Sequence, residues 1–128
     1  MSMTAKGTFE VELVMGAPEL AGAVQRLDLT KTFHGDLAGT ATGVMLTSGD
    51  AHAGEAGYVA IEVVTGQLGD RTGSFALQQF GTMHAGSQNL HYEVVPGSGH
   101  DALEGLTGKL HLTIENNGTH HYELEYEL

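Results

Sequence analysis

A single carboxylate interrupts one of the most apolar stretches of the chain. Glu62 lies within the run Tyr58–Thr65, whose other members are mainly aliphatic. Side chains alternate between the two faces of a β-strand, and opposite residues of an antiparallel pair point to the same side. If Val64 pairs with Phe75, the face that carries Glu62 also carries Tyr58, Phe75, Leu77 and Gln79. An inward Glu62 is a candidate general acid or base in a barrel interior.

The position of Glu62 depends on the strand register. A shift of one residue would turn Glu62 outward and leave inside the aliphatic residues Val59, Ile61 and Val63. An exposed or internally hydrogen-bonded glutamate is therefore at least as good an interpretation as a catalytic one. The sequence leaves both alternatives open.

Three tyrosines fall on the expected inner faces of later strands. Tyr92 belongs to a run that follows Phe80, and Tyr122 and Tyr126 alternate with acidic residues near the end of the chain. A buried tyrosine needs a hydrogen-bond partner for its hydroxyl. Together with Glu62 and Gln79, these tyrosines would line the polar end of an apolar cavity. The alternative, which we favour for two of the three, is that they fill the core.

Other chemistries have weaker support. His120 and His121 point to opposite faces of a strand, and only His91 and Glu93 have the i,i+2 spacing that places two metal ligands side by side. Ser74 lacks the strand–turn–helix elbow of a nucleophilic hydrolase. We therefore expect neither a metal nor a cofactor, and the sequence does not decide whether the protein is an enzyme.

The composition limits the partners and the compartment. Sixteen acidic residues against five basic ones give a formal charge of −11, which repels nucleic acid and anionic membranes. There is no cysteine and no long apolar segment, so we expect a cytoplasmic protein without disulfides or membrane spans. The length of 128 residues suits one domain, residues 1–128, with a single core.

Alternating hydrophobic patterns predict an all-β chain of about eight strands that are joined by short connections. The expected strands are Thr8–Val14, Val24–His34, Leu37–Thr47, Tyr58–Thr65, Ser74–Phe80 continuing to His84, Leu90–Val95, Lys109–Glu115 and a final strand through Leu128. In the first strand, Phe9, Val11, Leu13 and Met15 share one face, and we expect this strand to be half-buried. An up-and-down antiparallel sheet of this size can close into a barrel and satisfy both edges.

Two local patterns add detail to this barrel. The face shared by Leu37, Gly39, Ala41, Gly43 and Met45 is made mostly of small residues, which suits close backbone approach. Turn residues separate the strands, and we expect the reversal after His84 to use Ala85–Gln88, which would pair Thr82 with His91.

Several separated motifs also resemble one family. They are GDLAGT (residues 35–40), AGYVAIEVVTGQLGDRTGSFALQQFGTM (56–83), VVPGSG (94–99), ALEGLTG (102–108) and HHYELEYEL (120–128). Together they resemble the bacterial DUF3224 proteins and span nearly the whole chain. The resemblance implies an antiparallel barrel similar to allene oxide cyclase, often a homo-oligomer, with no established activity.

Three functions are compatible with these patterns. The first is a barrel that binds a small apolar or mixed-polarity molecule, with Tyr58, Glu62, Phe75, Leu77, Gln79, Tyr92, Tyr122 and Tyr126 as candidate binding residues. The second is a cofactor-free isomerase or cyclase that uses Glu62 as general acid or base. The third is a tightly packed barrel that serves in assembly. We rank binding first, because fold analogy alone does not establish a reaction.

Overall fold

The computed structural model describes residues 2–128, and nearly all of them lie in β-strands. The strands are β1 (Met3–Glu19), β2 (Val24–Gly35), β3 (Leu37–Asp50), β4 (Glu55–Leu68), β5 (Arg71–His84), β6 (Ser87–Val94), β7 (His100–Asp101), β8 (Thr107–Ile114) and β9 (His120–Glu127). Single turns of 3₁₀ helix connect β1 to β2 (Leu20–Gly22) and β3 to β4 (Ala51–Ala53). Within this part of the chain, no helix is long and apolar enough to cross a membrane.

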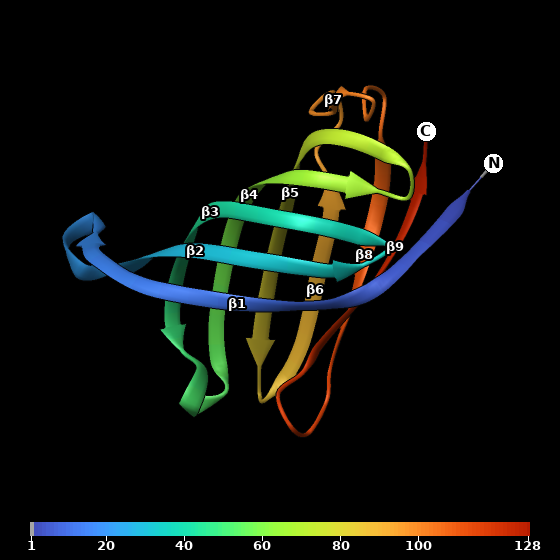
Figure 1. Ribbon diagram of the computed structural model, residues 1–128. Coiled ribbons are helices and arrows are strands. Elements are labelled where there is room, and N and C mark those ends of the chain that lie inside the picture. The colour runs from blue at the N-terminus through green and yellow to red at the C-terminus, as the bar shows by residue number, and fades with distance from the viewer. Residues whose placement is uncertain (1) are drawn as a thin grey trace.

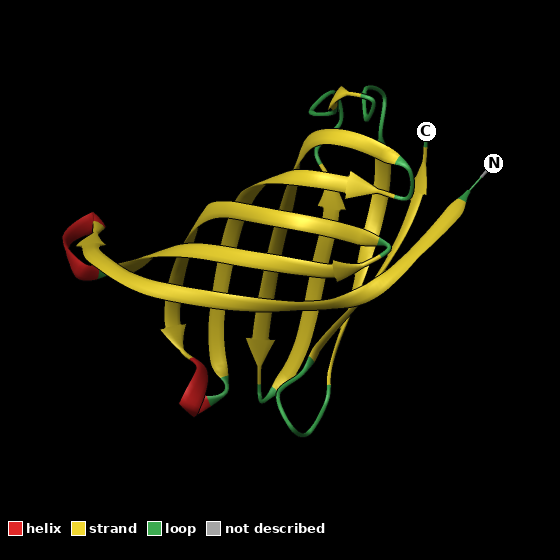
Figure 2. Ribbon diagram, in the orientation of Figure 1, coloured by secondary structure: helices red, strands yellow, loops and turns green. Residues whose placement is uncertain are grey.

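Eight of these strands close into an antiparallel barrel. Their order is β1-β2-β3-β4-β5-β6-β8-β9, and β9 returns to pair with β1. The short β7 adds two residue pairs at the start of β5. In Figure 1 the strands at the front cross those at the back at a steep angle, and Figure 2 shows how little of the chain is helical. The predicted eight-stranded antiparallel barrel is therefore confirmed.

One end of the barrel is closed by the segment between β6 and β8, which carries β7 (Figure 1). Leu103 and Leu106 from this segment are fully buried and belong to the same core cluster as Phe33, Phe75 and Leu124. A tight turn holds them there, since a Cβ on Gly99 would lie 1.9 Å from the carbonyl oxygen of Leu103. The segment fills the barrel end with apolar side chains.

The hairpin of β1 and β2 extends past the barrel, on the left in Figure 1. Leu13 and Met15 lie on the same face of β1 as the buried Phe9, but their relative exposures are 48% and 70%. The expectation of a half-buried strand therefore holds at Phe9 but is wrong at Leu13 and Met15, because this part of β1 extends beyond the strands that cover the face. The overhanging part of the hairpin therefore presents apolar side chains to solvent.

The turn between β5 and β6 uses two residues, Ala85 and Gly86, instead of the expected four. As a result Thr82 pairs with Asn89, and Phe80 is the partner of His91. The expected register differs from this one by two residues. Because side chains alternate with a period of two, this shift leaves every residue on its predicted face.

Candidate binding cavity and buried polar network

A cavity of about 390 Å³ opens at the end of the barrel opposite the Leu103 segment. Its walls come from the ends of β3, β4, β5, β6 and β8. The larger side chains that line it are Tyr58, Met83, Gln88, Asn89, Leu90, Leu112 and Ile114. None of the lining residues is ionisable as an acid or a base in the neutral pH range, so the cavity is uncharged.

The strands on one side of this cavity are only loosely joined. β6 and β8 share a single residue pair, Glu93 with Lys109, whereas β8 and β9 pair along their whole length. Leu90 and Leu112, which lie on β6 and β8 towards the open end, therefore line the cavity without a ladder between their strands. The splayed strands widen the barrel mouth on that side.

Tyr58 contributes a phenolic hydroxyl to the lining of the cavity. Its ring covers Gly81 so closely that a Cβ there would lie 2.6 Å from the nearest ring carbon. Its hydroxyl donates a hydrogen bond to Gln79 Oε1 at 2.7 Å. Burial raises the pKa of Tyr58, and the negative charge of Glu62 raises that pKa further. Tyr58 therefore stays a neutral hydrogen-bonding group near neutral pH.

An ion pair lies deeper in the barrel. Lys31 Nζ donates to Glu62 Oε1 at 3.0 Å and to the hydroxyl of Tyr92 at 2.7 Å. It also lies 2.9 Å from Glu62 Oε2, which is close enough for an ion pair although the angle is not that of a hydrogen bond. The Tyr92 hydroxyl donates in turn to Glu62 Oε1. These three side chains form a closed polar triad from β2, β4 and β6.

The small-residue face of β3 explains how the triad can form. Lys31 pairs with Ala41 and Glu62 pairs with Gly43, so β3 lies between the two charged residues. A Cβ on Gly43 would lie 2.8 Å from the Cα and Cβ of Glu62. Because Ala41 and Gly43 project so little into the barrel, the long Lys31 side chain reaches over β3 to the carboxylate.

Aromatic rings complete the surroundings of the ammonium group. Lys31 Nζ lies 4.7 Å from the ring centroid of Phe9 and 5.1 Å from that of Tyr92, within the range of cation–π attraction. Burial lowers the pKa of Lys31, and the nearby charge of Glu62 opposes that effect. Burial also raises the pKa of Tyr92 well above its ordinary value, and Glu62 adds to this increase. Tyr92 is therefore held in its protonated, donating form.

The structure separates the predicted site residues into layers along the barrel axis. Tyr58 lines the cavity, while Gln79 and Tyr92 each lie two residues further inward than a cavity-lining neighbour on the same strand. Glu62 lies four residues beyond Tyr58 on β4, about 13 Å at the usual rise of a strand. Phe75 and Leu77 are part of the packed core.

The remaining two predicted residues are not part of this arrangement. The Tyr122 hydroxyl accepts a hydrogen bond from the Leu37 amide at 2.9 Å and lies 3.0 Å from the carbonyl oxygens of His34 and Leu37. It thereby fastens the turn between β2 and β3. Tyr126 packs against the core next to Gly108, its partner at the far end of β8 from the cavity.

Lys31 is the member of the triad that sequence reasoning missed. It occurs in phase with Leu29 and Phe33, both inward-facing, and this spacing was the available signal. A lysine in an apolar phase is normally assigned to solvent because an unpaired ammonium group is costly to bury. Only the pairing of β2 and β4 with β3 reveals the carboxylate that makes the inward position acceptable.

The geometry bears on the acid–base hypothesis for Glu62. Its side chain is 1% exposed, and its carboxylate contacts Lys31 and Tyr92. It is not among the residues that line the cavity. A molecule in the cavity would therefore contact Tyr58 and not the carboxylate of Glu62.

The fold and cavity define a class of protein, an eight-stranded antiparallel β-barrel that is filled at one end and open at the other. A family model described as a protein of unknown function (DUF3224) matches residues 5–126. A crystal structure of a DUF3224 protein of unknown function from Shewanella oneidensis is 43% identical and superposes with a TM-score of 0.92, covering 100% of this chain and 98% of that one. No curated protein matches. The chain belongs to the DUF3224 family.

Proposed function

We propose that this barrel binds a small, uncharged, largely apolar molecule in the cavity at its open end. The observation that carries the proposal is an opening of about 390 Å³ whose walls contain no charged residue. This volume lies within the range of roughly 300–1,000 Å³ that is typical of small-molecule sites. A buried or half-buried polar group at the inner end is the other usual feature of such sites.

The charge of the protein restricts the ligand class. A formal charge of −11 creates a negative potential that disfavours anions. No described cationic residue lines the cavity to offset that potential. A carboxylate or phosphate ligand would therefore be bound less well than a neutral molecule of the same size. The hydroxyl of Tyr58 already donates to Gln79, so it can accept a hydrogen bond from a ligand with one hydroxyl group at its buried end.

The proposal is tested by dye binding with paired probes. The uncharged dye Nile red should bind with increased fluorescence, and the anionic dye anilinonaphthalene sulfonate should bind more weakly. Leu112→Glu places a carboxylate in the half-exposed wall of the cavity and should weaken Nile red binding at least about tenfold, since the charge must be desolvated by the dye. Titration of each variant with each dye provides the comparison.

Thr113→Glu is the matched control, because Thr113 is the next residue on β8 and is exposed. It adds the same charge without entering the cavity and should bind Nile red as the wild type does. Equal Nile red affinity in Leu112→Glu and the wild type would rule out the cavity as the site. Circular dichroism of both variants checks that the fold is retained.

A further inference from the structure

The outer face of the barrel carries a contiguous apolar surface over β3, β4 and β5. We call it the apolar outer face and define it by Val44, Leu46, Val59, Ile61, Val63 and Phe80. All six side chains are exposed, with Ile61 at 56%. Single exposed aliphatic residues are ordinary on protein surfaces, but contiguous apolar patches usually mark an interaction site.

The strand register makes this surface continuous. Val44 pairs with Ile61, and Leu46 pairs with Val59, which in turn pairs with Phe80. These pairs form two adjacent rows across the sheet, because Val44 and Leu46 are two residues apart on β3 and Val59 and Ile61 are two residues apart on β4. A shallow groove of about 470 Å³ runs over all of the six defining residues except Val63, and Gln78, His91 and Glu93 line its border. Beyond Phe80, the ring of His91 stacks on it with centroids 4.6 Å apart.

The surface is also free of charge in a strongly acidic chain. Of the 16 acidic residues, Glu62 is the only one between Gly57 and Gly69, and it points inward. On β3 there is no charged residue from Leu37 to Gly49. A surface on which two equally acidic molecules meet must avoid facing carboxylates, because like charges across an interface are costly.

Charged residues occur at the two borders of this face in a specific order. Arg26 and Asp28 are the strand partners of Leu46 and Val44 on one side, and they form an exposed ion pair with each other at 3.2 Å. His91 and Glu93 pair with Phe80 and Gln78 on the other. Each border therefore carries one potential cation and one acid, two residues apart. One row across the strands consists of Arg26, Leu46, Val59, Phe80 and His91, and the next row consists of Asp28, Val44, Ile61, Gln78 and Glu93. A two-fold axis that lies between these rows, perpendicular to the strands, places each row opposite the other row of the second molecule. Each cation then opposes an acid of the other molecule.

From this arrangement we propose that the apolar outer face binds a second copy of this chain. The two faces pack with their strands antiparallel, Val59 of one copy over Ile61 of the other. At the borders Arg26 faces Asp28 of the second copy, and His91 faces Glu93 of the second copy. Such an isologous contact closes on itself and produces a dimer.

Sedimentation velocity over a concentration series tests the contact. The wild type should shift from monomer to dimer with rising concentration. Ile61→Glu places facing carboxylates at the centre of the interface and should raise the dimer dissociation constant about a hundredfold, because like charges in an interface cost several kcal/mol. Thr113→Glu adds the same charge on β8, outside the face, and should dimerise as the wild type does. A wild type that remains monomeric throughout, or an Ile61→Glu variant that still dimerises fully, would overturn the proposal.

Charge reversal tests the orientation. Arg26→Asp or Asp28→Arg alone should weaken the dimer, because the exchanged rows then place two like charges opposite each other. The double variant Arg26→Asp/Asp28→Arg should restore the dimer, because it restores the opposite charges between the copies and also keeps the ion pair that the two residues form within each chain. A double variant weaker than both single variants would contradict the two-fold axis. The result is independent of the cavity: Ile61→Glu should still bind Nile red, and Leu112→Glu should still dimerise.

Discussion

Lys31 and Glu62 form an ion pair from which water is almost excluded, with side-chain exposures of 5% and 1%. Desolvating two such ions costs several kcal/mol each, and their attraction repays this only with good geometry and further hydrogen bonds. Tyr92 and the ring of Phe9 supply those additional contacts. The pair therefore fixes how β2, β4 and β6 are placed more than it raises the net stability.

Removal of one partner should be far more damaging than removal of the whole triad. Lys31→Met and Glu62→Leu should each lower the free energy of unfolding by about 3–5 kcal/mol, since each leaves an unpaired buried charge. The triple variant Lys31→Met/Glu62→Leu/Tyr92→Phe should recover most of that loss. Urea unfolding of each variant gives the comparison.

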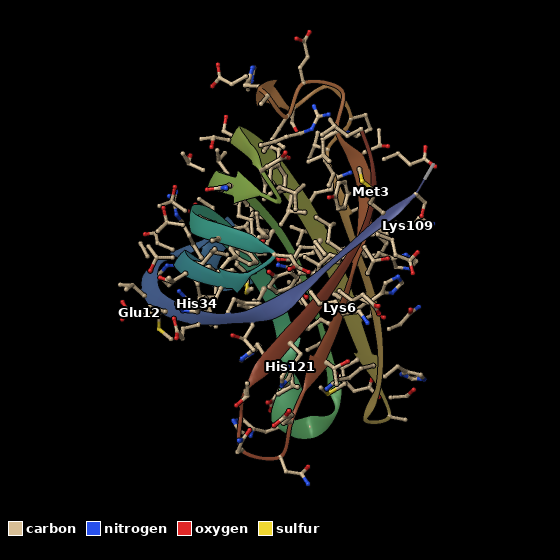
Figure 3. The ribbon with its side chains drawn as sticks, turned by 45° about the vertical axis from the view of Figure 1, so that its right-hand side comes forward. Met3, Lys6, Glu12, His34, Lys109 and His121 are labelled. Carbon is tan, nitrogen blue, oxygen red and sulfur yellow. The ribbon has the colours of Figure 1, made fainter. Side chains whose placement is uncertain are left out.

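Lys6→Met is the matched control for the buried lysine. Lys6 lies 3.5 Å from Glu123 in an exposed pair between β1 and β9, and Figure 3 shows its side chain near the crossing of these strands. Exposed pairs contribute about 0–1 kcal/mol, so this variant should remain close to the wild type. If the losses of the single variants simply added in the triple variant, the three residues would not act as a unit.

The alkaline stability should depend on Tyr92. Burial and Glu62 raise the pKa of Tyr92 in the folded state, whereas in the unfolded chain its hydroxyl ionises near pH 10. The folded state therefore holds this proton more tightly, and the associated stability is complete below about pH 10 and is lost as the pH rises towards the folded-state pKa.

Lys31 contributes with the opposite sign. Its pKa is lowered by burial, so the unfolded chain binds this proton more readily and stability rises with pH up to about 10.4. Above that pH the tyrosine contribution should dominate. Urea midpoints measured at increasing alkaline pH should fall less steeply in Tyr92→Phe than in the wild type, and parallel curves would contradict the assignment.

At the scale of elements, the turn between β5 and β6 shows how a two-residue hairpin sets a register. Ala85 and Gly86 have φ angles of 51° and 79°, the left-handed conformation that a type I′ turn requires at both positions. The Glu55 carboxylate also accepts a hydrogen bond from the Ala85 amide at 3.1 Å. Alanine is strained in this conformation, whereas asparagine and glycine adopt it readily.

Ala85→Asn should therefore stabilise the protein by about 1 kcal/mol, because it relieves the strain without changing a buried contact. Gly86→Ala is the reciprocal control: nothing lies within 4 Å of the added Cβ, so its φ angle alone should destabilise the protein by about 1–2 kcal/mol. Thermal unfolding of both variants measures the difference. A destabilised Ala85→Asn variant would show that the turn is not strained.

The features that could be predicted from the sequence are those that follow from the alternation of side chains between the two faces of a strand. Of the two registers that the sequence left open, the structure has the one that pairs Val64 with Phe75, and this register places Glu62 inside. Even the wrong register between β5 and β6 kept each face, because the error was two residues. Contacts between strands that are not neighbours had no such signal, so neither the partner of Lys31 nor the burial of Leu103 followed from periodicity.

At the scale of the whole molecule, the barrel surface is divided by charge. The apolar outer face of β3–β5 carries no acid, while β9 presents Glu123, Glu125 and Glu127 on the side away from the core. A high net charge keeps a protein soluble and opposes non-specific association. The uneven distribution therefore makes the apolar outer face the surface on which like charges would least oppose the dimer proposed above.

The closure of β1 on β9 has a consequence for biosynthesis. Residues 3–9 pair with residues 120–126, so a ribosome delivers one half of this ladder long before the other. Until β9 emerges, β1 carries a row of unpaired amides and carbonyls, and such open edges recruit strands from other chains. Contacts this distant in sequence also form slowly. The acidic stripe on β9 and Glu10 and Glu12 on β1 discourage intermolecular pairing during this interval, when the nascent chain is most exposed to aggregation.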